Sequence, residues 1–188
     1  MVRVATTGYV ALLRGVNVGG RNKVGMGELR DAFEAAGYSS VSTYIQSGNV
    51  VFDSDAPPDL LEASIEATLE RRFGFPIVVV VRSDAQLASV IGDAPDGFGH
   101  DSERFLWDAI FLKTPLSSEA AMRVVEQREG VDQAWPGTGV LYFSRLRERR
   151  TQSRMSRIVG TPEYRQMTIR SWSTTTKLGS LLDARRDG

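Results

Sequence analysis

Hydrophobic and polar positions in the first half of the chain switch repeatedly between strand-like and helix-like spacing. Short apolar runs bounded by glycine and polar residues predict strands. Apolar residues three or four positions apart predict helices, as at Met26, Leu29 and Phe33. The predicted elements are a strand at 9–14, a helix from Met26 that ends at Gly37, strands at 41–45 and 50–52, a helix at 57–73 and a strand at 75–81. This βαββαβ order is that of a ferredoxin-like plait.

The same order recurs after a loop rich in glycine, proline and aspartate at 92–102. Just before that loop, Ser83 and Gln86 have the capping-box spacing of a short helix. The later predicted elements are a strand at 105–112, a helix from Ser117 or Ser118 through 128, strands at 131–135 and 140–143 around a hairpin at 136–139, a helix at 153–159, a strand at 167–170 and a helix at 171–184. We therefore predict an α+β fold of two ferredoxin-like (βαββαβ) subdomains, at 1–91 and 92–188, with an added C-terminal helix. The two halves share no sequence repeat, so this prediction depends on element order.

The composition excludes several classes of chemistry. The chain has 188 residues, 41% of them hydrophobic, which is enough to bury a core. It has no cysteine, so disulfides, thiol nucleophiles and thiolate metal sites are excluded. No signal-peptide pattern opens the chain, and runs such as 77–81 are too short to span a bilayer. We expect a cytoplasmic protein without a membrane partner.

A polar, glycine-rich loop follows the first predicted strand. Loops of this kind, placed between a strand and a helix, can direct backbone N–H groups at an anion. Lys23 is followed by Val24, so the loop is not a Walker loop, which needs Ser or Thr there to reach magnesium. The alternative is a crossover loop that needs glycine for positive φ. The candidate ligand-binding residues here are Arg14, Asn17, Gly19, Gly20, Asn22 and Lys23.

Two further segments complete the candidate site. The hairpin turn around Gly48 offers Gln46, Ser47 and Asn49, although turn geometry alone explains the glycine. The nine residues from Arg14 to Asn49 named so far are called the N-terminal set. The start of the last predicted helix offers Arg170, Thr174 and Lys177, the C-terminal set, because anions favour a helix N-terminus. The alternative there is simple capping by Ser171 or Ser173.

The charge distribution suggests a second kind of partner. The net charge is zero, but residues 145–188 carry a balance of +7 and the preceding residues −7. Tyr142 and Phe143 stand on a predicted strand just before a basic cluster, and aromatics beside arginines can bind single-stranded nucleic acid. The cluster consists of Arg145, Arg147, Arg149, Arg150, Arg154 and Arg157. No segment matches the aromatic RNP1 pattern, so we expect any such binding to be non-sequence-specific.

Metal and nucleophile chemistry have little support in the sequence. His100 is the only histidine and stands in an acidic glycine loop. No nucleophile elbow occurs, and the acidic residues of that loop lack the spacing of a calcium loop. We predict no metal and no cofactor, and the sequence assigns no catalytic residue.

The amino-acid sequences of two segments resemble those of a known family. Residues 9–52 contain ALLRGVNVGG, KVGMGELR and TYIQSGNVVF, and residues 168–178 read TIRSWSTTTKL. These segments are similar to those of an uncharacterised bacterial family, the domain-of-unknown-function family 1697. Ser171 stands where members usually have Asn. The resemblance implies a ferredoxin-like fold and no established activity.

Three functional hypotheses are compatible with these patterns. The leading one is a protein that binds an anionic, phosphate-bearing ligand, either a small molecule such as a nucleotide or a nucleic acid. The alternatives are a small cofactor-independent enzyme that uses Arg, Lys, Asn and Ser side chains, and a protein-interaction module without a small ligand. If the N-terminal and C-terminal sets share one cleft, a ligand site is favoured. If they do not, each set is local structure.

Overall fold

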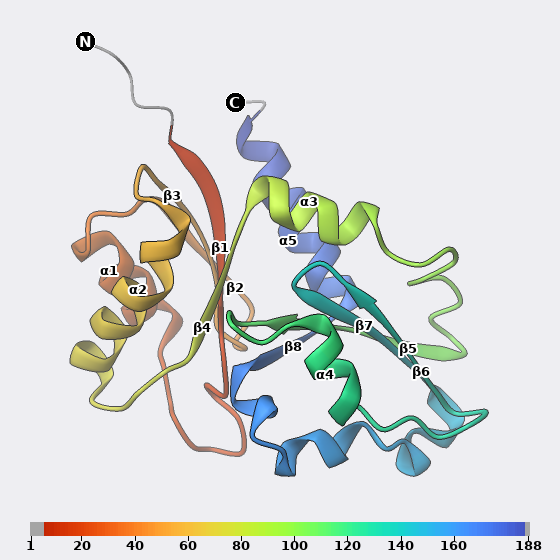
Figure 1. Cartoon of the computed structure of the whole chain (residues 1–188). Coiled ribbons are helices and arrows are strands. Elements are labelled where there is room, and N and C mark those ends of the chain that lie inside the picture. The colour runs from red at the N-terminus through yellow and green to blue at the C-terminus, as the bar shows by residue number, and fades with distance from the viewer. Residues whose placement is uncertain (1–5, 187–188) are drawn as a thin grey trace. The chain divides into compact units, whose positions relative to one another are not determined.

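A computed structural model describes residues 6–186 of the chain (Figure 1). It divides into two compact units. The first consists of the residues up to Ala88 together with those from Leu178 onward, and the second of Ser89–Lys177. No helix among residues 6–186 combines the length and apolar character that a membrane crossing requires.

The first unit contains a four-stranded antiparallel sheet. Its strands are β1 (Thr7–Leu13), β2 (Ser39–Tyr44), β3 (Asn49–Ser54) and β4 (Val79–Ser83), in the order β2-β3-β1-β4. The helices α1 (Met26–Ala35) and α2 (Pro58–Phe73) cover one face of this sheet (Figure 1). This is the strand order of a ferredoxin-like plait, as predicted from the sequence.

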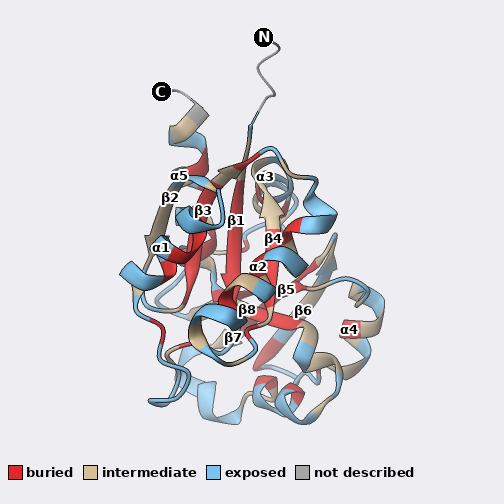
Figure 2. Ribbon diagram, turned by 90° about the vertical axis from the view of Figure 1, so that its left-hand side faces the viewer, coloured by how far each residue is buried: buried red, intermediate tan, exposed pale blue. Residues whose placement is uncertain are grey.

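Local sequence signals explain how these helices begin and end. Pro57 and Pro58 open α2, where proline lacks an N–H that the helix would leave unpaired anyway. Gly74 ends it with a φ of +79°, a left-handed conformation that favours glycine. Leu61 and Ile65 of α2 are buried in the core below the sheet. Figure 2 shows buried residues concentrated in the strands and on the inner sides of the helices.

The second unit repeats this topology. Its strands are β5 (Phe105–Leu112), β6 (Asp132–Gly137), β7 (Val140–Leu146) and β8 (Met167–Ser171), in the order β6-β7-β5-β8 with antiparallel neighbours. α4 (Ser118–Val124) begins at Ser117, whose Oγ accepts the Ala120 N–H at 3.2 Å. The remaining helices are α3 (Asp84–Gly92), before the second sheet, and α5 (Trp172–Arg186), which follows β8. The prediction of two ferredoxin-like units with an added C-terminal helix is confirmed.

One predicted helix is wrong. Residues 153–159 lie in a series of short 3-10 helices, η1 (Arg147–Gln152), η2 (Met155–Gly160) and η3 (Glu163–Gln166). The buried carboxylate of Asp132 accepts the backbone N–H of Arg154 at 2.8 Å and that of Arg128 at 3.0 Å. The Asp132 side chain, distant in sequence, therefore fixes the backbone at the start of this segment.

Three element boundaries also differ from the predictions. Pro136 and Gly137 belong to β6, so Thr138 and Gly139 alone connect β6 to β7. β4 begins at Val79 rather than at residue 75, and α4 ends at Val124. Packing explains Gly137, because a Cβ there would lie 2.6 Å from the Tyr142 ring.

Candidate functional site

An aromatic cluster covers part of the second sheet. The ring of Phe98, from the loop between α3 and β5, lies edge-on to Trp107, Tyr142 and Trp172 at centroid distances of 4.7, 5.3 and 4.9 Å. Trp135 meets the same ring at 5.9 Å. Such edge-to-face pairs contribute about 0.5–1.5 kcal/mol each beyond their burial. Phe98 therefore holds its loop against the sheet.

The loop approaches the start of α5 closely at Gly99. Its φ is +84°, and a Cβ at this position would lie 2.3 Å from the indole ring of Trp172. Only glycine satisfies both conditions without displacing the ring. Gly99 and Trp172 therefore set how near the loop lies to α5.

A pocket of about 440 Å³ opens between this loop, β5 and the start of α5. We call it the α5 pocket. Part of its lining is aromatic and part is polar, with one arginine. The lining residues are Gly99, Ser102, Phe105, Leu106, Trp107, Arg147, Ser171, Trp172, Ser173 and Thr176. Pockets of roughly 300–1,000 Å³ with apolar walls and a few polar groups are typical ligand sites.

Arg147 holds one side of the α5 pocket. Its Nε and Nη2 donate to the carbonyl oxygen of Ser102 at 3.1 and 2.7 Å, and its backbone N–H donates to the Arg104 carbonyl at 2.8 Å. Because a guanidinium carries five N–H donors, others remain for a ligand. The two bonds to Ser102 hold the guanidinium in place before any ligand arrives.

Hydroxyl groups of Ser171, Ser173 and Thr176, at the start of α5, line part of the α5 pocket. Ser171 is the N-cap, since its Oγ accepts the Thr174 N–H at 3.2 Å. The Oγ atoms of Ser171 and Ser173 lie 3.1 Å apart, and Thr176 Oγ1 donates to the Trp172 carbonyl at 3.1 Å. The predicted capping by Ser171 or Ser173 therefore resolves in favour of Ser171.

The C-terminal set lies beside this pocket in sequence. Arg170 is buried on β8, and burial lowers the pKa of its guanidinium to about 10. Thr174 is buried and accepts the Ser171 hydroxyl at 2.9 Å, whereas Lys177 is exposed. The described lining of the α5 pocket does not include these three residues. It includes their sequence neighbours Ser171, Trp172, Ser173 and Thr176, and the role predicted for the set itself stays a prediction.

The N-terminal set forms a separate, internally bonded structure in the first unit. The Asn17 amide donates to the carbonyl oxygens of Val24 and Gln46 and accepts the Val24 N–H, each at 2.9 Å. Asn22 donates to the Gly15 carbonyl at 3.3 Å. Asn17 therefore joins the loop at 14–25, the N-terminal loop, to the hairpin turn.

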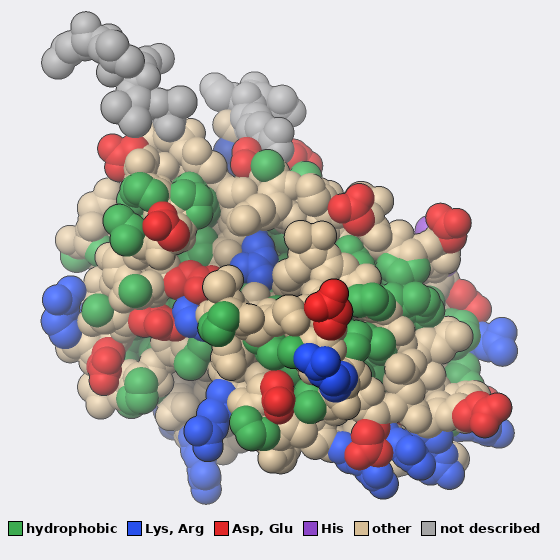
Figure 3. Space-filling view, in the orientation of Figure 1, with side chains coloured by type: hydrophobic (Ala, Val, Ile, Leu, Met, Phe, Trp, Pro, Cys, Tyr) green, Lys and Arg blue, Asp and Glu red, His purple; other side chains and the backbone are tan. Residues whose placement is uncertain are grey.

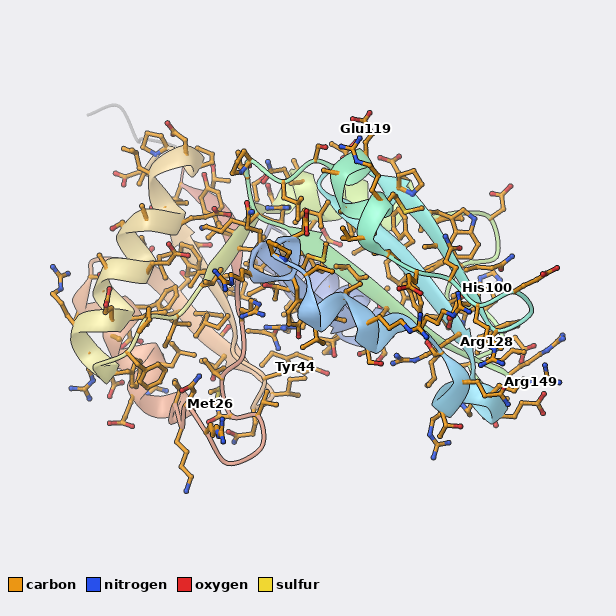
Figure 4. The ribbon with its side chains drawn as sticks, turned by 60° about the horizontal axis from the view of Figure 1, so that its bottom comes forward. Met26, Tyr44, His100, Glu119, Arg128 and Arg149 are labelled. Carbon is orange, nitrogen blue, oxygen red and sulfur yellow. The ribbon has the colours of Figure 1, made fainter. Side chains whose placement is uncertain are left out.

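The hairpin turn is fixed in the same way. Asn49 is fully buried, and its amide donates to the Tyr44 carbonyl at 2.9 Å and to Ser47 Oγ at 3.0 Å. Tyr44 ends β2 and leads into this turn (Figure 4). A Cβ on Gly48 would lie 2.6 Å from Val16, so only glycine permits this packing. Gln46, Lys23, Gly19 and Gly20 are exposed, and Arg14 is half-buried.

Most of the basic cluster is occupied by contacts inside the protein. Arg145 lies 3.1 Å from the Asp108 carboxylate and donates to the sulfur of Met155. Burial raises the pKa of Asp108, and the attraction of Arg145 opposes that shift. Arg154 and Arg157 both pair with Glu126. Arg149 and Arg150 are exposed on η1, and Arg149 extends away from the ribbon (Figure 4).

The surface near η1 carries charges of both signs. Figure 3 shows Lys and Arg side chains gathered at the lower right with acidic ones among them, over the light-blue segment of Figure 1 that contains η1. Among residues 6–186, no group of three or more His, Cys, Asp or Glu side chains could hold a metal ion. His100 is exposed in its loop.

The sequence reasoning missed the aromatic lining of the α5 pocket. Phe105 and Trp107 stand at the start of a strand, where aromatic residues are also common in sheet cores. The available signal was the pair Phe98-Gly99 in an otherwise polar loop, since a lone aromatic beside glycine suggests a loop that packs on something.

Comparison with known proteins identifies one solved structure and one family model similar to this chain. A solved structure of similar fold is that of the conserved bacterial protein SP0830 from Streptococcus pneumoniae. It has a TM-score of 0.83 and 27% identity, and the match covers 95% of this chain and 99% of that one. A search of curated proteins finds no match. The model of the protein family of unknown function DUF1697 matches residues 6–142, which include the Phe105 side of the α5 pocket. The chain belongs to the DUF1697 family.

Proposed function

We propose that this protein binds a small anionic ligand with a planar ring, of the nucleotide type, in the α5 pocket. The observation that carries the proposal is the composition of one pocket of about 440 Å³, which is lined by aromatic rings, an arginine and four Ser and Thr residues. Its volume lies within the range that ligands of nucleotide size occupy.

The aromatic residues suit the planar part of such a ligand. Phe105, Trp107 and Trp172 all line the α5 pocket. Trp107 and Trp172 are held in place by Phe98, so a ring that enters meets a preformed surface. Stacking of a base on an aromatic side chain contributes about 1–3 kcal/mol.

The polar residues suit the anionic part. Arg147 is anchored by Ser102 and can still donate to a phosphate, a geometry that guanidinium groups favour. Ser173 adds a hydroxyl group at the first turn of a helix of 15 residues, where the helix dipole also attracts an anion.

Isothermal titration calorimetry tests the proposal with AMP, CMP, GMP and UMP. Adenosine and inorganic phosphate are titrated separately, because each supplies only one half of the recognised chemistry. We expect the monophosphates to bind more tightly than either half. Because a hydrogen bond to a charged group contributes about 1.5–3 kcal/mol, Arg147→Gln should weaken binding by about ten-fold or more.

The matched control is Arg123→Gln, which removes an exposed arginine from α4 in the same unit. It should leave nucleotide affinity unchanged. Trp172→Phe keeps an aromatic ring in contact with the loop and should retain part of the affinity. Equal affinity for adenosine and AMP, or an equal loss in both arginine variants, would refute the proposal.

A further inference from the structure

We infer that the nucleotide held in the α5 pocket is one unit of a single-stranded nucleic acid, whose phosphates continue over the neighbouring arginines. This inference rests on the proposed function. It adds that the natural ligand is a polymer and that a second surface takes part in binding.

A second hollow shares the lining residue Arg147 with the α5 pocket. That hollow, of about 530 Å³, is lined by Glu103, Arg104, Arg147, Glu148 and Arg150, and we call it the arginine hollow. Arg147 lines both, so it stands at their boundary. A ligand whose phosphate meets Arg147 from the α5 pocket therefore has its next phosphate beside the arginine hollow.

The arginines of the hollow are available for phosphates. Among residues 6–186, Arg104, Arg147 and Arg150 are in no ion pair, in contrast to Arg154 and Arg157, which share Glu126. The guanidinium of Arg104 lies over the Phe105 ring, 5.2 Å from its centroid. Phe105 itself lines the α5 pocket. Arg104 is therefore held between the two sites, next to the aromatic wall.

Two carboxylates reduce the positive charge of the arginine hollow. Glu103 and Glu148 line it together with the three arginines, so the balance is positive by one charge. This arrangement fits moderate affinity that depends strongly on salt. It also supplies a test, because removal of the Glu148 charge should strengthen the binding of a polyanion.

The same features favour a polymer over a free nucleotide and predict how it is recognised. A mononucleotide would fill the α5 pocket and leave the arginine hollow unused. Aromatic stacking accepts any base, and arginines on phosphates carry no base information. We therefore expect binding that is specific for single strands and tolerant of sequence.

Fluorescence anisotropy with end-labelled ten-nucleotide oligo(U) and oligo(dT), compared with titration of UMP, tests this inference. The oligonucleotides should bind at least about ten-fold more tightly than UMP, because they add phosphate contacts. The double variant Arg104→Gln/Arg150→Gln should weaken oligonucleotide binding and leave UMP affinity within about two-fold. It should also flatten the slope of log K against log salt by about 1.4, since each phosphate contact on a single strand contributes about 0.7.

Further variants separate charge from folding. Arg104→Lys/Arg150→Lys keeps the charges and should retain most of the oligonucleotide affinity. Glu148→Gln should raise it, and Arg123→Gln should leave it unchanged. If UMP binds and the oligonucleotides bind no better, or if the Gln double variant changes nothing, the inference fails and the proposed function stands. If UMP and the oligonucleotides both fail to bind, both are refuted.

Discussion

The N-terminal loop and the α5 pocket look alike in sequence but use their polar groups differently. Both combine a glycine-bearing loop with polar and basic residues near strand ends. In the N-terminal loop, the Asn17 amide makes three hydrogen bonds within the loop and its hairpin neighbour. In the α5 pocket, Arg147 and the hydroxyls of α5 also make internal hydrogen bonds, but their side chains line an open volume. Polar residues beside a glycine-bearing loop therefore indicate a ligand site only where they also line an open volume.

The largest effect should come from Gly99→Ala. The added Cβ meets the Trp172 ring, and alanine at a φ of +84° is strained. We expect a loss of about 2–3 kcal/mol of unfolding free energy and weaker nucleotide binding. Urea denaturation followed by circular dichroism measures the first, and calorimetry the second.

The control for that substitution is Gly97→Ala in the same loop. Gly97 has a φ of +76°, and nothing lies within 4 Å of the added Cβ. This variant carries only the backbone strain, so its cost should be about 1 kcal/mol. Equal losses at the two glycines would mean that the approach of the loop to Trp172 does not shape the pocket.

The next effect should be that of Asn17→Ala. Its three hydrogen bonds join the N-terminal loop to the hairpin turn, so we expect a loss of about 2 kcal/mol of unfolding free energy. Asn22→Ala is the matched control, because both asparagines have positive φ and Asn22 donates one bond of 3.3 Å. The Asn17 variant should bind nucleotide normally. If instead it is as stable as wild type and loses a ligand, the loop is a binding site rather than a scaffold.

A smaller effect concerns pH and the pair of Asp108 with Arg145. Burial raises the pKa of Asp108 above 3.8, so the folded state binds a proton more tightly than the unfolded chain does. The contribution of this group to stability is therefore greatest below pH 3.8 and falls as pH rises through the raised pKa. Denaturation at a series of pH values should show a slope that Asp108→Asn reduces. Identical slopes for the two proteins would contradict this assignment.

The smallest effect should be that of Lys23→Ala. Lys23 is exposed in the N-terminal loop, so the unfolding free energy should change by no more than about ±0.5 kcal/mol. Nucleotide affinity at the α5 pocket should also stay unchanged. Titration with inorganic phosphate then decides whether the loop holds an anion of its own, as its sequence predicts. A drop in phosphate affinity at unchanged stability would place a second site in the first unit.

Local signals explain why so much of the fold could be predicted. The capping box at the start of α3 forms as expected, since Gln86 Oε1 accepts the Ser83 N–H at 2.9 Å and Ser83 Oγ accepts the Gln86 N–H at 3.2 Å. Gly74 ends α2 as predicted. Each of these features depends on residues within one turn of each other, and such chemistry is visible in the sequence.

The features that sequence reasoning missed depend on residues far apart in the chain. The segment around Arg154 is held by Asp132, and Arg147 is held by the Ser102 carbonyl, 45 residues away. The C-terminal set was predicted at the start of α5, but the pocket there is lined by its sequence neighbours Ser173 and Thr176 and by Gly99, which closely approaches Trp172. No local sequence pattern predicts the contact between Gly99 and Trp172.

The positions of the tryptophans around Phe98 allow unfolding of the second unit to be followed by its own spectroscopic signal. The chain has three tryptophans, Trp107, Trp135 and Trp172, and each of them contacts the Phe98 ring. All three belong to the second unit, so tryptophan fluorescence, excited at a wavelength that tyrosine does not absorb, reports on that unit alone, while far-ultraviolet circular dichroism reports on both. Recorded on the same denaturation series, the two signals coincide if the units unfold together and separate if they do not.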